Sequence, residues 1–202
     1  MKLFIACASS NDINELYYKD SLELIKELMK NNDLVFGAYN EGLMGECYKY
    51  AKQNNRHITG ISPLAFKEDL DKLACDNSIL TKSINERTEQ LITNSDAIVF
   101  LPGGIGTIHE LLSSIDMKRS NETAVPIIIH NESHYYDELI TFLDKLYKEK
   151  FSSDIIKKDY YISNSIEETI RLINSISKNW CFIIYVILLS NEKKLIVIKN
   201  KK

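Results

Sequence analysis

Short apolar runs alternate with amphipathic segments along most of the chain. The clearest strand is residues 96–101, DAIVFL, which is apolar almost throughout, as in a strand buried on both faces. The first amphipathic helix is expected to begin at a cap formed by Asn11 or Asp12. Its apolar positions recur at helical spacing and are Leu16, Leu22, Ile25, Leu28 and Met29.

The same pattern predicts an alternation of strands and helices. The expected strands are residues 2–8, 34–37, 57–61, 79–81, 96–101, 125–129 and 160–162. The later helices are expected at residues 42–54, 83–94, 104–120, 135–148 and 165–177. This order predicts an α/β fold in three layers, a mostly parallel sheet with helices on both faces. Right-handed crossovers place the carboxyl ends of the strands along one edge, where such folds bind ligands.

Residues 178–202 depart from this pattern. Two apolar runs, WCFIIYVILL and LIVIK, flank the polar segment SNEKK. We therefore expect one domain over residues 1–177 and a C-terminal extension over residues 178–202, folded as a β-hairpin. An extension without a function is the alternative. The longest apolar run, Trp180 to Leu189, is shorter than the ~20 residues that a membrane span needs, so no membrane partner is expected.

Net charge and cysteine content limit the kinds of partner and compartment that we expect for the protein. The 202 residues carry a formal net charge of −3, and no excess of positive charge favours a nucleic acid. The four cysteines form no C-x-x-C pair, which is typical of reduced thiols in a cytoplasmic protein. His130 and His134 straddle the expected end of a strand instead of sharing a helix, so we expect no metal site there.

Glycines cluster where the most apolar strand ends. Residues 102–110 read PGGIGTIHE and open an expected helix. Because glycines lack a Cβ atom, an anion can approach the backbone N–H groups closely, and the positive end of the helix favours it. A tight turn without a ligand is the alternative. The residues expected to bind a phosphate group are Gly103, Gly104, Ile105, Gly106 and Thr107, the last also through its hydroxyl.

This loop differs from two common glycine-rich phosphate loops. The lysine of the P-loop, G-x-x-x-x-G-K, is absent. The dinucleotide fingerprint needs a glycine where His109 stands, and the first strand is followed by residues 7–10, CASS, without a glycine. A dehydrogenase is therefore disfavoured.

Two charged residues are candidates for catalysis, and each has a simpler explanation. Glu110 follows Thr107 at the spacing of a helix capping box, yet it also projects beside the expected phosphate. Arg87 lies in the preceding helix, where it is either a solvated residue or a counter-charge for a phosphate or a developing oxyanion. The residues alone leave these alternatives open.

The glycine segment resembles the P-G-G-x-G-T-x-x-E motif of the cytokinin-activating "Lonely Guy" (LOG) phosphoribohydrolases. Three further segments match in order: residues 7–10 resemble the family's C-G-S-S, residues 36–45 its Y-G-G-G…G-L-M-G, and residues 134–137 its G-Y-Y-D. The resemblance covers residues 2–177. It implies a Rossmann-like domain in a homodimer, with sites near the subunit boundary.

The resemblance also implies a reaction, the hydrolysis of the N-glycosidic bond of a nucleoside 5′-monophosphate, often N6-modified AMP. It implies Arg87 and Glu110 as the catalytic residues and no metal or organic cofactor. A carboxylate can stabilise oxocarbenium character on the ribose or orient the attacking water, and the arginine can offset charge on the departing purine. The other expected substrate contacts are Ser9, Ser10, Asp69, Thr88 and Asp116.

Departures from the family motif bear on activity. Thr88 stands where the family has a lysine after the catalytic arginine, and Ala38 and Tyr39 replace two glycines. Tyr39 is either a packed aromatic residue or a platform that stacks on a base. A module that senses a nucleotide without hydrolysing it is therefore the alternative function.

Overall fold

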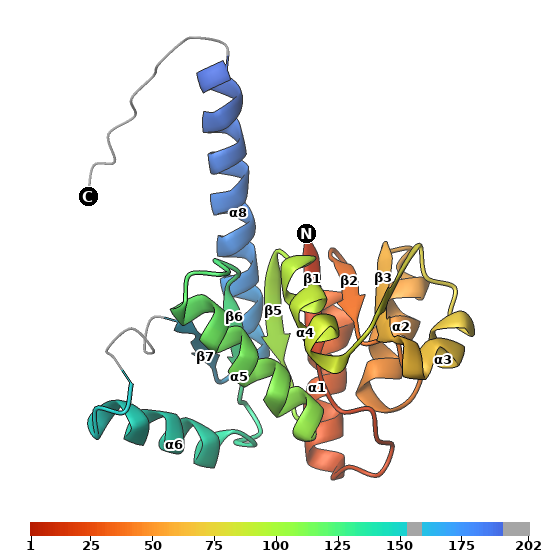
Figure 1. The fold of residues 1–202 in the computed structure, drawn as a ribbon, viewed down its shortest axis with the longest axis horizontal. Helices are drawn as coiled ribbons and strands as arrows, with labels where there is room; N and C mark the ends of the chain where they lie inside the picture. The colour runs from red at the N-terminus through yellow and green to blue at the C-terminus, as the bar shows by residue number, and fades with distance from the viewer. Residues whose placement is uncertain (153–158, 192–202) are drawn as a thin grey trace.

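The computed structural model describes residues 1–152 and 159–191, with side chains described up to residue 178. Seven strands form one sheet in the order β4-β3-β2-β1-β5-β6-β7, and every neighbouring pair is parallel (Figure 1). The predicted α/β class is confirmed. The strands are β1 (Lys2–Ala6), β2 (Asp33–Phe36), β3 (Ile58–Pro63), β4 (Asn77–Thr81), β5 (Ala97–Phe100), β6 (Ile127–His130) and β7 (Tyr161–Ser163).

Helices cover both faces of this sheet. They are α1 (Glu15–Leu28), α2 (Gly42–Gln53), α3 (Lys67–Asp71), α4 (Ile84–Thr93), α5 (Ile105–Arg119), α6 (Asp137–Lys148) and α8 (Ile166–Asn191), with a 3₁₀ turn η1 (Leu64–Phe66). Side chains of β1 alternate between the faces: Leu3 and Ile5 pack toward α1, α2 and α8, whereas Phe4 and Ala6 pack toward α4, α5 and α6. The three predicted layers follow from this alternation.

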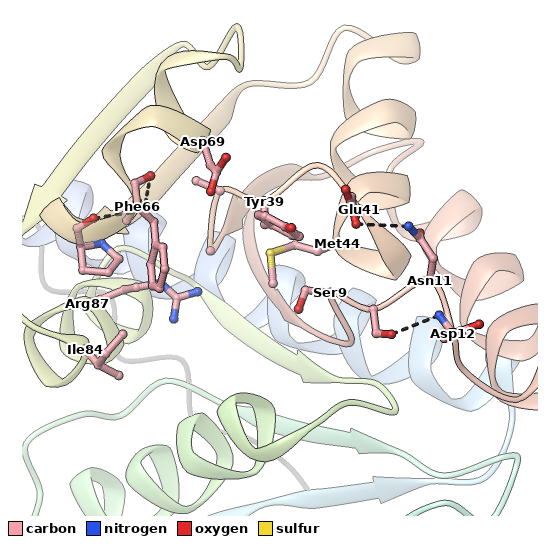
Figure 2. Close-up of a pocket in the computed structure, with 15 residues that line it drawn as sticks. Ser9, Asn11, Asp12, Tyr39, Glu41, Met44, Phe66, Asp69, Ile84 and Arg87 are labelled. Carbon is pink, nitrogen blue, oxygen red and sulfur yellow. Dashed lines mark hydrogen bonds between the residues drawn. The ribbon is translucent and has the colours of Figure 1, made fainter.

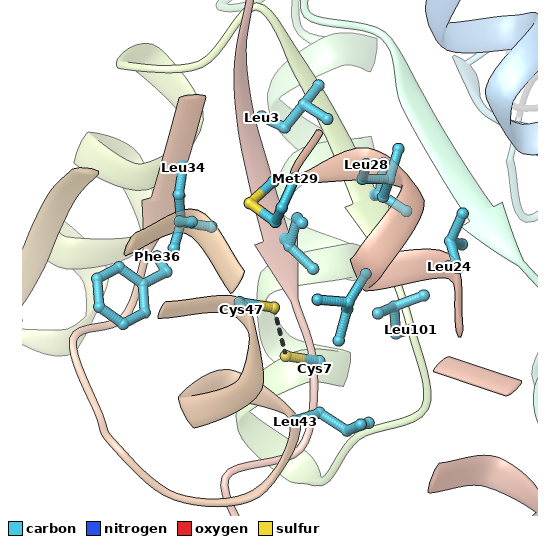
Figure 3. Close-up of a cluster of buried hydrophobic side chains, with 14 of the residues drawn as sticks. Leu3, Cys7, Leu24, Leu28, Met29, Leu34, Phe36, Leu43, Cys47 and Leu101 are labelled. Carbon is cyan, nitrogen blue, oxygen red and sulfur yellow. Dashed lines mark hydrogen bonds between the residues drawn. The ribbon is translucent and has the colours of Figure 1, made fainter. Parts of the chain in front are cut away.

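The core on the α1 and α2 face fixes the elements that lead into the strand-end loops. Figure 3 shows Leu28 of α1 and Leu43 of α2 packed in the same buried cluster as Leu3 of β1. Burial of a side chain of this size stabilises the fold by about 1.5–3 kcal/mol. Cys7 Sγ lies 4.0 Å from Cys47 Sγ in this cluster, and that contact together with burial raises the pKa of the Cys7 thiol.

The predicted cap of the first helix is wrong. α1 begins at Glu15, and Asn14 caps it by accepting a hydrogen bond from the N–H of Leu16 at 2.9 Å. Asn11 instead accepts a bond from the N–H of Gly42 at 2.9 Å, so it belongs to a loop that reaches α2. Local sequence could not show this, because the partner lies in another element.

The predicted C-terminal hairpin is wrong in its first part. α8 runs on to Asn191, so the apolar run Trp180 to Leu189 is helical (Figure 1). A continuous apolar run has no period that separates a helix from a strand, and no glycine or proline interrupts residues 166–191. The expected second strand, LIVIK, falls within residues 192–202, which lie outside the described residues. Within the described part of the chain, no helix has the length and apolar character needed to cross a membrane.

Candidate active site

The direction of strand order reverses between β1 and β5. The sheet extends from β1 through β2 and β3 to β4 on one side, and from β1 through β5 to β7 on the other. Ligands of α/β sheets bind at such a switch point, beyond the carboxyl ends of the strands. Ser9 and Ser10 follow β1, Gly103 and Gly104 follow β5, and all of these line one cavity of about 380 Å³. The structure therefore brings two predicted phosphate-binding segments together.

A larger cavity of about 790 Å³ adjoins the first (Figure 2). Ser9, Ser10 and Asp12 line both cavities, which makes them neighbouring parts of one site. The larger cavity also contains Arg87, and its remaining lining mixes apolar and acidic side chains. These include Tyr39, Met44, Phe66, Glu41 and Asp69.

In the glycine loop, protein donors hold the carbonyl groups. The carbonyl oxygens of residues 101–104 each accept a hydrogen bond from the protein. In chain order the donors are Tyr136 Oη at 2.6 Å, Ala8 N at 3.0 Å, Tyr135 Oη at 2.6 Å and Ile108 N at 3.0 Å. With their carbonyl groups held in this way, the peptide units of the loop have fixed orientations.

The N–H groups of the same loop are free by contrast. Among the described residues, no protein acceptor meets the backbone N–H groups of residues 103–107. A Cβ atom added at Gly104 or Gly106 would have nothing within 4 Å, so the space beside both residues is open. Unpaired donors beside open space at a helix N-terminus are suited to an anion.

Gly103 and Thr107 have a structural role in this loop. A Cβ atom at Gly103 would lie 2.2 Å from Thr107 Oγ1, so the glycine makes room for that side chain. The buried Thr107 hydroxyl donates to the carbonyl of Cys7 at 3.2 Å. The predicted use of this hydroxyl as a phosphate donor therefore does not fit the geometry, although the Thr107 N–H remains available.

Arg87, which lines the larger cavity, forms a buried ion pair with Glu110 behind it. Arg87 Nη1 lies 3.0 Å from Glu110 Oε1, and the two side chains are only 14% and 7% exposed. The Arg87 Nε–H also donates to the carbonyl of Ile61 at 3.2 Å. The solvated alternative for Arg87 is therefore wrong. So is the capping box, because α5 begins at Ile105 with Gly104 as its cap.

Burial sets the electrostatics of this pair. Removal from water raises the pKa of the Glu110 carboxyl above 4.5, and the Arg87 guanidinium partly offsets that rise. Loss of one partner from a buried ion pair costs about 3–5 kcal/mol, because the other charge is left uncompensated. The pair is thus held firmly, and its carboxylate gains a proton more readily than an exposed glutamate does.

The backbone after β2 makes room for the arginine. A Cβ atom at Gly37 would lie 1.8 Å from Arg87 Nη2, so the guanidinium in its paired position occupies the space that a side chain at residue 37 would need. Ala38 adopts a φ of 58°, a left-handed conformation that favours glycine. The replacement of a family glycine by Ala38 thus keeps a glycine-like backbone. Tyr39, the second replacement, is half-buried and lines the larger cavity (Figure 2).

Comparison with known proteins identifies the family. The family model described as "Possible lysine decarboxylase" matches residues 44–173. Two cytokinin riboside 5′-monophosphate phosphoribohydrolases of the LOG group from Arabidopsis thaliana are each 30% identical. One aligns over 78% of this chain and 75% of its own, the other over 84% and 81%. The chain belongs to the LOG family.

Solved structures share the fold of this LOG-family chain. The molybdenum cofactor carrier protein of Chlamydomonas reinhardtii is 17% identical with a TM-score of 0.62, and covers 88% of this chain and 98% of its own. The molybdenum cofactor binding protein of Rippkaea orientalis is 21% identical with a TM-score of 0.63, at 87% and 96% coverage. At these identities the likeness concerns the fold alone.

Two predicted substrate contacts of the LOG-family chain lie away from the site. Thr88 and Asp116 line a separate cavity of about 230 Å³ that also contains His109. The Thr88 hydroxyl donates to the carbonyl of Ile84 in its own helix, and Asp116 pairs with Arg119 at 2.6 Å. Neither shares a cavity with the Arg87 guanidinium. For Thr88 this follows from its place next to Arg87 in α4, because adjacent helical positions point in different directions.

Of the remaining predicted contacts, Asp69 lies in the site, whereas the side chain of Ile105 does not. Asp69 lines the larger cavity, where its carboxylate pairs with Lys72 at 3.0 Å. The Ile105 side chain is not part of either main cavity lining, and the residue is 86% exposed. Only the Ile105 backbone N–H is thus in a position to serve an anion.

Several cavity residues were not predicted from the sequence. Tyr17 and Tyr135 form one wall of the smaller cavity, with ring centroids 5.0 Å apart. Met44 and Phe66 line the larger one. The family-like segment at residues 134–137 was the available signal for Tyr135, whereas Phe66 lies in the 3₁₀ turn η1 and belongs to no motif.

The two histidines, His130 and His134, have different surroundings. His130 is buried, with Nε2 3.1 Å from Asp20 Oδ1 and Nδ1 2.9 Å from Thr169 Oγ1, whereas His134 is exposed. Asp20, His130 and Glu132 offer ligand-type atoms within 4.8 Å of one another. Both ring nitrogens of His130 already have protein partners, so this group joins α1, β6 and α8 as a hydrogen-bonded network.

Proposed function

We propose that this protein hydrolyses the N-glycosidic bond of a purine nucleoside 5′-monophosphate and releases the free base and ribose 5-phosphate. The observation that carries the proposal is the row of N–H groups at residues 103–107, which meet no acceptor among the described residues, together with the Arg87 and Glu110 ion pair at the adjoining cavity. The names of the relatives support a cytokinin-type substrate, in which the adenine carries an N6 substituent.

The two cavities suit the two ends of such a substrate. The smaller cavity, with the glycine loop, Ser9 and Ser10, would take the 5′-phosphate. The nucleoside would extend into the larger cavity, where Tyr39 and Phe66 offer aromatic surface to a purine. The phosphate, remote from the reacting carbon, would supply binding energy that positions the ribose.

The chemistry follows from the ion pair. When the C1′–N bond breaks, its electrons leave with the base, and C1′ gains oxocarbenium character. Arg87 lines the larger cavity and would offset the negative charge on the departing purine. Glu110 would orient a water whose oxygen bonds to C1′, and a proton from that water balances the charge on the base.

Product analysis tests the proposal. The protein is incubated with AMP and with N6-isopentenyl-AMP, and the free base is separated by chromatography. We expect base and ribose 5-phosphate in equal amounts. As a control for nonspecific effects of substitution, Glu27→Gln changes an exposed carboxylate of α1 and should leave the rate unchanged. No base from a panel of purine monophosphates would contradict the proposal.

A binding role without turnover is the second candidate. One observation favours it: Glu110 is not part of either main cavity lining, and its carboxylate is occupied by Arg87. In the proposed hydrolysis, Arg87 would turn toward the base and so expose Glu110 to the ribose. Tight binding of AMP with no release of adenine would support the sensor instead.

The proposal includes a cytoplasmic homodimer, as the family resemblance implies. Ile84, Ile105 and Leu112 of α4 and α5 are exposed apolar residues, and association would bury them. The free thiols of Cys7 and Cys47 are typical of a reducing compartment. Sedimentation velocity should give twice the chain mass of 23.3 kDa, and a monomer at micromolar concentration would contradict the dimer.

A further inference from the structure

We infer that Tyr135 is a positioning residue that holds the glycine loop with its N–H groups directed toward the anion. The inference rests on the proposed function for the identity of the ligand. It concerns the hydroxyl group, which donates to the Gly103 carbonyl at 2.6 Å. Tyr135 lines the same cavity as Gly103 and Gly104, so this bond lies at the edge of the expected phosphate site.

The Tyr135 side chain is fixed before any ligand arrives. Its ring packs edge-on against Tyr17, with centroids 5.0 Å apart and an interplanar angle of 74°. It also packs edge-on against Tyr136, at 5.0 Å and 86°. Such aromatic contacts contribute about 0.5–1.5 kcal/mol each beyond simple burial, so the hydroxyl is held in place.

The geometry of the peptide unit converts this bond into an orientation of the loop. The carbonyl of Gly103 and the N–H of Gly104 belong to one planar trans peptide and point in opposite directions. A donor that fixes the carbonyl on one side therefore fixes the N–H on the other. Glycines on both sides of this peptide give it unusual freedom to rotate. Without Tyr135, the Gly103 carbonyl can turn toward the phosphate, where its partial negative charge repels the ligand.

The adjacent tyrosine has a different role. Tyr136 donates to the carbonyl of Leu101 at 2.6 Å, but its side chain is buried in the core on the α4 and α5 face. Leu101 directly follows the end of β5 and does not line the smaller cavity. The two phenol groups thus make the same kind of bond, one to the scaffold and one to the ligand-binding turn.

The experiment compares Tyr135→Phe with Tyr136→Phe and with Tyr161→Phe, an exposed position on β7. Binding of ribose 5-phosphate is measured by calorimetry, and inhibition of AMP hydrolysis by adenosine reports on a ligand without a phosphate. We expect Tyr135→Phe to weaken ribose 5-phosphate binding about tenfold and adenosine inhibition less than twofold. Tyr136→Phe should lower the melting temperature and leave the affinities for both ligands nearly unchanged. Tyr161→Phe should match the wild type.

The outcomes separate this inference from the proposed function. Ribose 5-phosphate affinity unchanged in Tyr135→Phe overturns the inference, and so does an equal loss for both ligands, which would indicate general damage to the site. Wild-type protein that binds ribose 5-phosphate but releases no base contradicts only the proposed function. In that case the affinity for adenosine is measured directly by calorimetry instead of by inhibition. A tenfold loss for ribose 5-phosphate with less than a twofold loss for adenosine in Tyr135→Phe still supports the inference.

Discussion

The glycine loop at residues 101–107 and the buried network around His130 are built from similar polar groups but satisfy them differently. In the loop, protein donors hold the carbonyl groups of residues 101–104, and the N–H groups of residues 103–107 have no acceptor among the described residues. In the network, both ring nitrogens of His130 have partners within 3.1 Å. Unpaired donors are costly unless a ligand meets them. The loop is therefore suited to bind, whereas the network holds α1, β6 and α8 together.

The largest expected effect is on turnover. Glu110→Gln keeps the shape of the side chain and an acceptor for Arg87, but removes the carboxylate. We expect kcat for AMP to fall by about 10²-fold or more, while the affinity for ribose 5-phosphate changes little. Base release under saturating AMP measures the first quantity and calorimetry the second. Turnover in Glu110→Gln equal to that of the wild type would show that Glu110 has a structural role, like the residues of the His130 network, and no catalytic one.

Alanine at two adjacent glycines sharpens the comparison within the loop. Gly104→Ala adds a methyl group to open space at a φ of −83°, which alanine adopts readily, so the protein should fold as stably as the wild type. The methyl group occupies the ligand's place, and AMP affinity should fall at least tenfold, about 1.4 kcal/mol. Calorimetry and thermal unfolding measure the two effects.

Gly103→Ala is the matched variant and should show the opposite balance. Its new Cβ atom would lie 2.2 Å from Thr107 Oγ1, so overpacking should lower the free energy of unfolding by about 1–3 kcal/mol. A Gly104→Ala variant that binds AMP normally would show that the open space beside the loop is not the ligand site.

The His130 network should respond in stability and not in activity. His130→Leu leaves Asp20 and Thr169 without their ring partner, and we expect the free energy of unfolding to fall by about 2 kcal/mol. Below the melting transition, kcat/KM for AMP should stay within twofold of the wild type. Denaturant titration and steady-state kinetics test this, with His57→Leu as an exposed control. A large loss of kcat/KM in the folded variant would link the network to the site.

The smallest effect is a pH dependence of stability. Because burial raises the pKa of Glu110, the folded state holds that proton more tightly than the unfolded chain does. The carboxyl therefore contributes no penalty below its unfolded pKa, and an increasing one as pH rises toward its folded pKa. Relative to Glu110→Gln, wild-type stability should decline as pH rises from about 4.5. Denaturant titrations between pH 4 and 7 test the sign, and a rising difference would contradict it.

Local pattern was enough to predict most elements and one half of the site. The strand at residues 96–101 and the glycines after it are close in sequence, so their chemistry and their place at a helix N-terminus could be read directly. The capping-box alternative for Glu110 rested on the same kind of local pattern, and it is wrong because the partner of Glu110 is Arg87, 23 residues away.

The sequence by itself determined the alternation of strands and helices, the parallel sheet and the turn with its glycines, because hydrophobic period and glycine content act over a few neighbouring residues. Only the tertiary structure decided that Arg87 pairs with Glu110, that Thr88 lies in a different cavity, and that Tyr135 donates to Gly103. These contacts join residues far apart in the chain. They depend on how whole elements pack, and packing direction is not encoded in the spacing of any single segment.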